Sequence, residues 1–233
     1  MATQALRAGK AHAFVDDLVV PVLDPDDRHH LERVLRLAAG DLVTVADGVG
    51  AWRPCRFGAD LEPLGDITVD PPSQPPVTVA FTVIKGDRPE WTVQKLTELG
   101  VDVIVPMHTD RSVVRWTGER GERHVARLRR VAREAAMQSR RSRLPVVEPV
   151  ASFAEVVARP AARLAAPGGR APAVGDAVVL VGPEGGWTEA ELAAGAPVIG
   201  LGPTVLRAET AAVAVGVLLT ALRPGGALNA KGG

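Results

Sequence analysis

The stretch AVVLVGPEGGWTEAEL, residues 177–192, carries the clearest information about the fold. Its first five residues are apolar and mostly β-branched, as in a parallel strand that is buried on both faces. Thr188 and Glu191 have the spacing of a capping box, which predicts a helix that starts at Glu189. A glycine-rich turn therefore joins the carboxyl end of a strand to a helix, where α/β proteins commonly bind small molecules.

The turn GPEGG itself, residues 182–186, does not match the two common nucleotide-binding motifs. It lacks the spacing G-x-G-x-x-G, and no G-K-[ST] follows it. Glu184 would also repel a phosphate group. Glycine permits positive φ and a close approach of a ligand to the backbone, so the turn is either an ordinary tight connection or a ligand site.

Composition limits the function classes. The 233 residues include 27 Lys or Arg and 27 Asp or Glu, so the overall charge indicates no partner. Cys55 is the single cysteine, which excludes an internal disulfide, and the adjacent His29 and His30 lack suitably spaced partners for a metal site. No apolar run approaches the roughly 20 residues that span a bilayer, and no signal-peptide core is visible. We expect a cytoplasmic protein without a membrane or metal partner.

A proline-rich segment, DPPSQPPV at residues 70–77, predicts a linker between two domains, residues 1–74 and 75–233. The first domain is expected to be small and β-rich, with one helix at about Arg28–Leu37 that is ended by Gly40. Its predicted strands include Leu18–Val22, Leu42–Val45 and Ile67–Val69.

The second domain alternates strand and helix patterns, which predicts an α/β fold with a mostly parallel sheet. Arg159–Asp176 is rich in Ala, Pro and Gly and is expected to be a loose loop around one weak strand. The predicted strands are Val77–Ile84, Val101–Pro106, Ala162–Ala166, Ala177–Val181 and a run from Pro197. The predicted helices follow the caps Asp87, Ser152 and Thr188, or cover about Gly121–Arg140 and Ala208–Arg223.

Positive charge is concentrated in residues 111–143, which hold eleven Arg against three Glu, whereas residues 1–75 hold seven Lys or Arg against twelve Asp or Glu. On the predicted helix in this segment, arginines fall mainly away from the apolar stripe of Val125, Leu128, Ala132, Ala135 and Ser139. A solvated face is one interpretation. Acidic partners are few, however, and clustered guanidinium groups suit phosphate oxygens, so the segment favours a nucleic-acid partner.

A second loop, LGPTVLRAETAA at residues 201–212, follows the last predicted strand and leads into the last helix. Glu209 and Thr210 suit the free amides of a helix N-terminus, whereas a cation such as Arg207 is disfavoured there. We interpret the two glycine-containing loops, at residues 182–186 and 201–206, as two walls of one pocket.

Five motifs, taken in order, closely resemble the RsmE family of bacterial ribosomal RNA small subunit methyltransferases. HHLERVLRLAAGD, residues 29–41, is similar to that family's N-terminal RNA-binding domain of PUA type, so the resemblance covers almost the whole chain. The motifs are KGDRPEWTVQKLTELGVDVIVP (85–106), RSV (111–113), EAAMQSRRSRLP (134–145), GPEGG (182–186) and LGPTVLRAETAA (201–212).

The resemblance implies a SPOUT-type, trefoil-knotted parallel-sheet methyltransferase domain preceded by a small β-rich PUA-like domain. It implies a homodimer that binds S-adenosylmethionine and methylates N3 of one uridine in the 16S rRNA of the 30S ribosomal subunit. Alternatives are another SPOUT enzyme that modifies tRNA or a ribose 2′-hydroxyl, and a non-catalytic RNA-binding assembly factor. Thr204 stands where many relatives carry Arg.

The resemblance and the two loops together give the expected site residues. Arg207 is expected to stabilise the uridine anion, and Glu209 to accept the N3 proton or to orient Arg207. The expected cofactor-binding residues are Val181, Gly182, Glu184, Gly185, Gly186, Leu201, Gly202, Val205, Leu206 and Thr210. The expected RNA-binding residues are Arg36, Lys85, Arg88, Arg111, Arg115, Gln138, Arg140 and Arg141.

Overall fold

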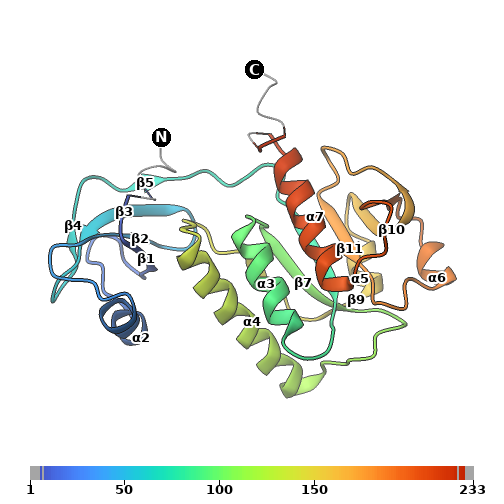
Figure 1. The fold of residues 1–233 in the computed structure, drawn as a ribbon, viewed down its shortest axis with the longest axis horizontal. Helices are drawn as coiled ribbons and strands as arrows, with labels where there is room; N and C mark the ends of the chain where they lie inside the picture. Colours follow the sequence, from blue (N-terminus) through green and yellow to red (C-terminus); the bar gives the residue numbers. More distant parts are fainter. Residues whose placement is uncertain (1–5, 7, 225, 229–233) are drawn as a thin grey trace. The chain divides into compact units, whose positions relative to one another are not determined.

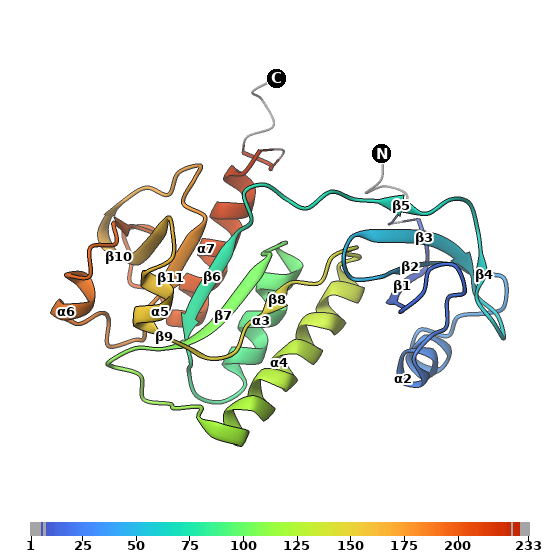
Figure 2. The same cartoon turned by 180° about the vertical axis from the view of Figure 1, so that it is seen from behind.

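The computed structural model describes residues 6, 8–224 and 226–228. Its internal contacts divide the chain into two compact units (Figures 1 and 2). The N-terminal unit comprises Met1–Pro72 and Arg133–Leu144, and the C-terminal unit comprises Ser73–Ala132 and Pro145–Gly233. The division thus falls within the proline-rich segment, and it also assigns a short segment from the middle of the chain to the first unit.

The N-terminal unit is built on a mixed five-stranded sheet. Strand β1 pairs in parallel with β2, β2 pairs antiparallel with β3, and β3 also pairs with both β4 and β5. Its core consists of buried apolar side chains between the sheet and the following helical turns, among them Leu31 and Val45. The elements are β1 Ala11–Phe14, α2 Pro25–His29, the π-helix η1 His30–Val34, β2 Leu42–Ala46, β3 Ala51–Arg56, β4 Glu62–Pro63 and β5 Thr68–Val69.

The strand predicted at Leu18–Val22 is wrong, because this run is an irregular loop in which Val19 and Val20 are exposed. The Asp17 carboxylate accepts the backbone N–H of Val19 at 2.6 Å, and this local bond competes with strand pairing. Pro21 also lacks the N–H that a ladder requires. The strand of this region is β1, which the sequence patterns did not predict.

The helix predicted at Arg28–Leu37 is shifted and irregular. It begins at Pro25 after the cap Asp24, whose carboxylate accepts Asp26 N–H at 2.9 Å, and a π-helical turn ends it at Val34. Proline suits the first helical turn, which explains the earlier start.

The C-terminal unit contains a parallel sheet of seven strands in the order β12-β10-β11-β6-β7-β8, with β9 also paired to β7. This arrangement confirms the predicted α/β fold class, and the strong strand predicted from AVVLV is β11. The strands are β6 Thr78–Thr82, β7 Val103–His108, β8 Val146–Val147, β9 Ala151–Ser152, β10 Ala162–Arg170, β11 Val178–Val181 and β12 Val198–Ile199.

Helices cover both faces of this sheet (Figures 1 and 2). One face buries Val79 and Phe81 of β6 against α3, α4 and α7, while Ala80 between them faces α5 and Trp187, as the two-residue period of a strand requires. The helices are α3 Arg88–Glu98, α4 Gly118–Gln138, α5 Phe153–Val157, α6 Glu189–Leu192 and α7 Ala208–Leu222.

The helices after Asp87, Ser152 and Thr188 all begin where the caps predicted, and two of the three caps form side-chain capping bonds. Ser152 and Thr188 both form complete capping boxes, as predicted. Asp87 occupies the position before α3 but makes no side-chain capping bond. Helix α4 begins three residues before the predicted start, and Val125, Leu128, Ala132 and Ala135 are buried, whereas Ser139 lies beyond the helix and is half-buried.

The segment Arg159–Asp176, predicted as a loose loop around one weak strand at Ala162–Ala166, contains a longer strand of nine residues, β10, between β11 and β12. Ala165 and Arg170 both pair with Ile199, so residues 166–169 bulge out of the ladder. Asp176 then anchors the strand's end, because its buried carboxylate binds both Arg163 and Arg170. These two guanidinium groups hold the pKa of the Asp176 carboxyl down at about 2.

Candidate functional site

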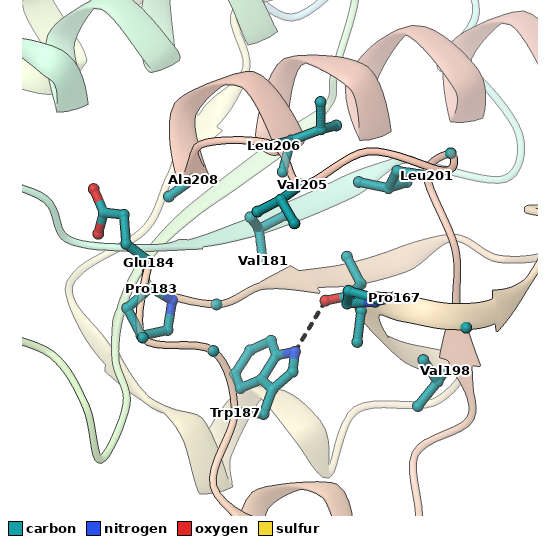
Figure 3. A pocket seen from close by; sticks show the side chains of 18 of the residues that line it. Pro167, Val181, Pro183, Glu184, Trp187, Val198, Leu201, Val205, Leu206 and Ala208 are labelled. Atoms are coloured by element: carbon teal, nitrogen blue, oxygen red, sulfur yellow. Dashed lines mark hydrogen bonds between the residues drawn. The ribbon is translucent and has the colours of Figure 1, made fainter.

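A cavity of about 730 Å³ opens beside the carboxyl ends of β10 and β11 (Figure 3). Its volume falls in the range of roughly 300–1,000 Å³ that is common for small-molecule sites. Three segments form its walls: residues 165–168, residues 181–187 and residues 201–208, with further lining from α6, β12 and α7.

The first wall is the glycine-rich turn after β11. The N–H of Gly186 donates to the carbonyl of Pro183 at 2.8 Å, and Gly186 adopts a φ of +71°, which favours glycine. Gly182 lies against the indole ring of Trp187, because a Cβ built on Gly182 would approach that ring to 3.0 Å. The turn therefore depends on glycine at two positions for different reasons.

The second wall follows β12 and leads into α7. Gly202 has a φ of +141°, and a Cβ at this position would meet no atom within 4 Å, so the space in front of it is open. Val205 is 92 % exposed, and with Leu201 and Leu206 it gives this wall an apolar surface. Exposed apolar side chains that line a cavity are typical of a ligand site.

The third wall, residues 165–168, is the bulge of β10, which the sequence patterns did not assign to the site. The indole Nε1 of Trp187 donates a hydrogen bond to the carbonyl oxygen of Ala165 at 2.9 Å and so joins this wall to the first (Figure 3). At the base of the bulge, a Cβ on Gly200 would approach the carbonyl oxygen of Gly169 to 2.7 Å. The backbones of β10 and β12 come this close because both positions are glycine.

Arg207 and Glu209 lie at the rim of the cavity, on either side of the lining residue Ala208. Arg207 occupies the position before α7, is exposed, and makes no side-chain hydrogen bond or ion pair with any residue that the structure describes. The Glu209 side chain is only 12 % exposed, and its Oε2 is buried without a hydrogen-bond partner among the described residues. The cation nearest to it is Arg88, at 3.7 Å, and not Arg207.

Two arginines from distant parts of the chain contact the glycine-rich turn. Nη1 of Arg88, at the start of α3, donates to Oε1 of Glu184 at 3.1 Å. Nη1 of Arg111, in the loop after β7, donates to the carbonyl oxygen of Gly185 at 2.6 Å. Both belong to the expected RNA-binding residues, and in the structure both guanidinium groups contact the wall of the cavity.

The structure gathers most of the expected cofactor residues in one place. Nine of the ten line the cavity, and Thr210 does not, because it is exposed on α7. The lining residues that the sequence patterns missed include Ala165, Ala166, Pro167, Gly168, Trp187 and Val198. A Pro-Gly-Gly run at a strand end was the available signal for the third wall.

The expected RNA-binding residues fall in both units. In the C-terminal unit, Lys85 is exposed, and Arg115 donates to the carbonyl of Thr109 at 3.1 Å. In the N-terminal unit, Arg36 and Gln138 are exposed and Arg141 is half-buried. The Arg140 guanidinium donates to the carbonyls of Leu6 and Lys10 at 3.3 and 3.1 Å, so this side chain also stabilises the N-terminal unit.

The arginines of α4 have more acidic partners than the sequence indicated. Arg127 pairs with Glu90 at 3.1 Å, and Arg133 forms a two-bond pair with Asp27 that raises the pKa of its guanidinium. These partners lie far away in the sequence, so helical spacing did not reveal them. Within the described part of the chain, no three His, Cys, Asp or Glu side chains form a metal site, and no helix is long and apolar enough to cross a bilayer.

Comparisons with known proteins identify the relatives of this chain. The pattern of the RNA methyltransferase domain family matches residues 71–220. The chain is 37% identical to the ribosomal RNA small subunit methyltransferase E of Mycobacterium bovis, over 88% of this chain and 90% of that protein. The corresponding Bacillus subtilis protein is 28% identical, over 80% of this chain and 84% of its own.

Solved structures give the same result. The crystal structure of a ribosomal RNA small subunit methyltransferase E from Neisseria gonorrhoeae bound to S-adenosyl methionine superposes with a TM-score of 0.72. It is 31% identical and covers 89% of this chain and 95% of its own. A probable rRNA-methyltransferase from Porphyromonas gingivalis superposes with a TM-score of 0.74 at 27% identity, over 88% of this chain and 95% of its own.

Proposed function

This chain belongs to the family of ribosomal RNA small subunit methyltransferase E, and on that premise we propose that it transfers a methyl group from S-adenosylmethionine to N3 of one uridine in 16S rRNA. The supporting observation is the cavity with an unpaired cation, Arg207, at its rim. A relative of known structure, 31% identical, is bound to S-adenosyl methionine.

The residues of the cavity fit S-adenosylmethionine. A Cβ added at Gly186 or Gly202 would extend into open space, so both glycines leave room for a ligand against the backbone. Glu184 is the one charged side chain among the described lining residues, and Arg88 already pairs with it. A cofactor without phosphate suits such a cavity, which explains why the turn lacks a phosphate-binding motif.

We propose that the nine lining residues expected from the sequence hold the adenosine part through backbone groups and close apolar contacts, and that Thr210 acts from outside the lining. When bound, S-adenosylmethionine supplies a methyl group on a positively charged sulfonium. The chain's own contribution is to hold this group and the uridine in contact and to exclude water between the three walls.

Uridine N3 carries a proton that must leave before or during methyl transfer. We propose that Arg207, whose guanidinium has no partner in the described part of the chain, stabilises the negative charge that develops on the uridine. The unpartnered Oε2 of Glu209 is available to accept the N3 proton or a hydrogen bond. An orienting role of Glu209 toward Arg207 has less support, since Glu209 is nearest to Arg88.

We propose that residues 1–74 are a PUA-like RNA-binding domain and that residues 75–233 are the SPOUT methyltransferase domain with a trefoil knot. The RNA partner is the 16S rRNA of the 30S subunit, which implies a cytoplasmic location. Phosphate contacts are proposed for Arg36, Lys85, Arg111, Arg115, Gln138, Arg140 and Arg141.

A homodimer is also proposed, and the composition of α7 supports it. This helix is apolar around most of its circumference. Ala212, Val215 and Leu219 face the core, yet Val217 on another side is 44 % exposed. A helix that is hydrophobic all round is normally buried, so a second copy of the chain is the proposed cover.

A transfer assay with radiolabelled S-adenosylmethionine tests the function. Small subunits, naked 16S rRNA and tRNA are offered separately, and the expected result is label in 16S rRNA, alone or in the subunit. Label in tRNA would indicate another SPOUT activity. Binding of RNA without label in any substrate would favour a non-catalytic assembly factor.

A further inference from the structure

Arg88 makes three polar contacts from the first turn of α3. Its Nη1 donates to Oε1 of Glu184 at 3.1 Å and lies 3.7 Å from Oε2 of Glu209. Its Nε donates to the carbonyl of Lys85 at 3.2 Å, which restricts the orientation of the guanidinium. The group is 38 % exposed, so its position depends on these contacts more than on burial.

The two carboxylates belong to different walls of the cavity. Glu184 is part of the glycine-rich turn, and Figure 3 shows its carboxylate turned away from Trp187, toward the outside of the cavity. Glu209 is in the first turn of α7, next to the lining residue Ala208. One guanidinium therefore bridges two walls that are separate in the sequence.

No other Lys or Arg of the described chain comes within 4.0 Å of either carboxylate. Glu209 is largely buried, and a buried carboxylate without a cation is strongly unfavourable. Arg207, two residues away in sequence, does not provide this charge. Removing Arg88 would thus leave both carboxylates without a neutralising cation, and the cost would fall mainly on the buried Glu209.

We propose that Arg88 is a positioning residue that holds the first and second walls together and keeps Oε2 of Glu209 at the rim of the cavity. This inference rests on the proposed function and replaces the RNA contact expected for Arg88. Its consequence is a slower release of bound cofactor. A second consequence is that the Glu209 carboxylate stays close to the position from which the uridine N3 proton leaves.

The change Arg88→Ala is expected to weaken S-adenosylmethionine binding about tenfold, mainly through faster dissociation. The rate at saturating cofactor and RNA also falls, while the RNA affinity stays unchanged. Arg88→Lys recovers only part of the cofactor affinity, because a single ammonium cannot reproduce the fork of a guanidinium. Lys95→Ala, which removes a cation of the same helix that pairs with Glu98 at 2.8 Å, is the matched control.

A double-mutant cycle measured by titration calorimetry with S-adenosylmethionine separates positioning from general destabilisation. The single variants are Arg88→Ala, Glu184→Gln and Glu209→Gln, combined in pairs, with thermal unfolding of each variant as the check on folding. The expected result is that Arg88→Ala reduces the cofactor affinity by much less than tenfold in a protein that already carries Glu184→Gln or Glu209→Gln. Stopped-flow tryptophan fluorescence, to which the cavity-lining Trp187 contributes, reports the dissociation rate.

Additive effects in both cycles would overturn the proposal. So would an Arg88→Ala variant that keeps its cofactor affinity but loses RNA affinity, since Arg88 would then be an RNA contact. If the wild-type protein does not bind S-adenosylmethionine at all, the proposed function fails and the positioning role fails with it. A wild type that binds, beside an unchanged Arg88→Ala variant, rejects the positioning role alone.

Discussion

The indole nitrogen of Trp187 donates a hydrogen bond to the carbonyl oxygen of Ala165 at 2.9 Å, across 22 residues of sequence. Trp187 ends the glycine-rich turn, and Ala165 is the last residue of β10 before its bulge. The bond therefore fixes the distance between two walls of the cavity. A cavity that is already formed loses less entropy when its ligand binds.

The first prediction concerns this bond. Trp187→Phe keeps an aromatic ring beside Gly182 but removes the N–H donor, so the two walls are less firmly joined. We expect S-adenosylmethionine affinity to fall about fivefold, which corresponds to one ordinary hydrogen bond of about 1 kcal/mol. Titration calorimetry measures this affinity. The control is Trp91→Phe, because Trp91 lies on the exposed side of α3. Equal affinities in the two variants would mean that the bond does not shape the site.

The second prediction concerns the glycines of the two loops. Gly186→Val and Gly202→Val place a branched side chain in the open space of the cavity, and each is expected to reduce cofactor affinity severely while the fold persists. Gly195→Val is the matched control, because Gly195 also has a positive φ, +88°, and open space around it but does not line the cavity. Calorimetry that gives the wild-type affinity for both cavity variants would remove the loops from the site.

The parts of the fold that the sequence predicted are those with local signals. The run AVVLV is apolar at every position, and Thr188 and Glu191 form a capping box within one turn of helix, so β11 and α6 were predictable. The loop at Leu18–Val22 shows the limit of such reasoning. Its valines suit a strand, yet the Asp17 carboxylate and Pro21 decide its conformation.

The candidate site divides in the same way. The glycine loops were predictable because glycine and proline mark strand ends, whereas the bulge at residues 166–169 depends on the pairing of β10 with both neighbours. The contact of Arg88 with Glu209 joins residues 121 positions apart, and no spacing rule reaches so far. Long-range ion pairs of this kind require the tertiary structure.

The third prediction separates two roles of Arg140, which has a φ of +57° and donates to two carbonyls of the N-terminal unit. Arg140→Ala and Arg140→Gly both remove the guanidinium, but glycine relieves the left-handed backbone, so the glycine variant should be more stable by about 1 kcal/mol. If Arg140 contacts phosphate, both variants lose RNA affinity equally and the salt slope falls by about one unit. RNA binding at wild-type strength in both variants would leave Arg140 a purely structural role.

The fourth prediction concerns pH. Burial lowers the pKa of His12 to about 4, and the bond from its Nε2 to the carbonyl of Arg141 only partly opposes this effect. Since a carbonyl only accepts, Nε2 carries the proton and Nδ1 accepts from the Thr44 hydroxyl at 2.8 Å. The native protein thus holds His12 neutral where the unfolded chain is already protonated.

Above about pH 6.5, His12 is neutral in both states and the full stability is present. As the pH falls toward 4, the unfolded chain takes up the proton first, so the free energy of unfolding decreases by up to about 3 kcal/mol. Urea unfolding across this range measures it. His12→Gln should be less stable at pH 7.5 but should show a flatter dependence on pH than the wild type. Parallel curves for the two proteins would contradict the assignment to His12.

The fifth prediction concerns Arg207. Arg207→Ala is expected to lower the single-turnover methylation rate by a hundredfold or more, on the scale of about 2.7–4 kcal/mol for the loss of one preorganised donor. Arg207→Lys should recover only part of the rate. Glu209→Gln should be comparably severe if Glu209 accepts the N3 proton, and milder otherwise. A near-normal rate in Arg207→Ala would reject the catalytic assignment.

Methyl transfer to N3 of a uridine in 16S rRNA leaves 3-methyluridine in the product, which nucleoside mass spectrometry of the reacted RNA detects. Small subunits or naked 16S rRNA are incubated with S-adenosylmethionine and either the wild-type protein or Arg207→Ala, and the RNA is then digested to nucleosides. We expect one equivalent of 3-methyluridine from the wild type and a strongly reduced amount from the variant. A methyl group on a ribose, on another base or on no nucleoside of this RNA would contradict this expectation.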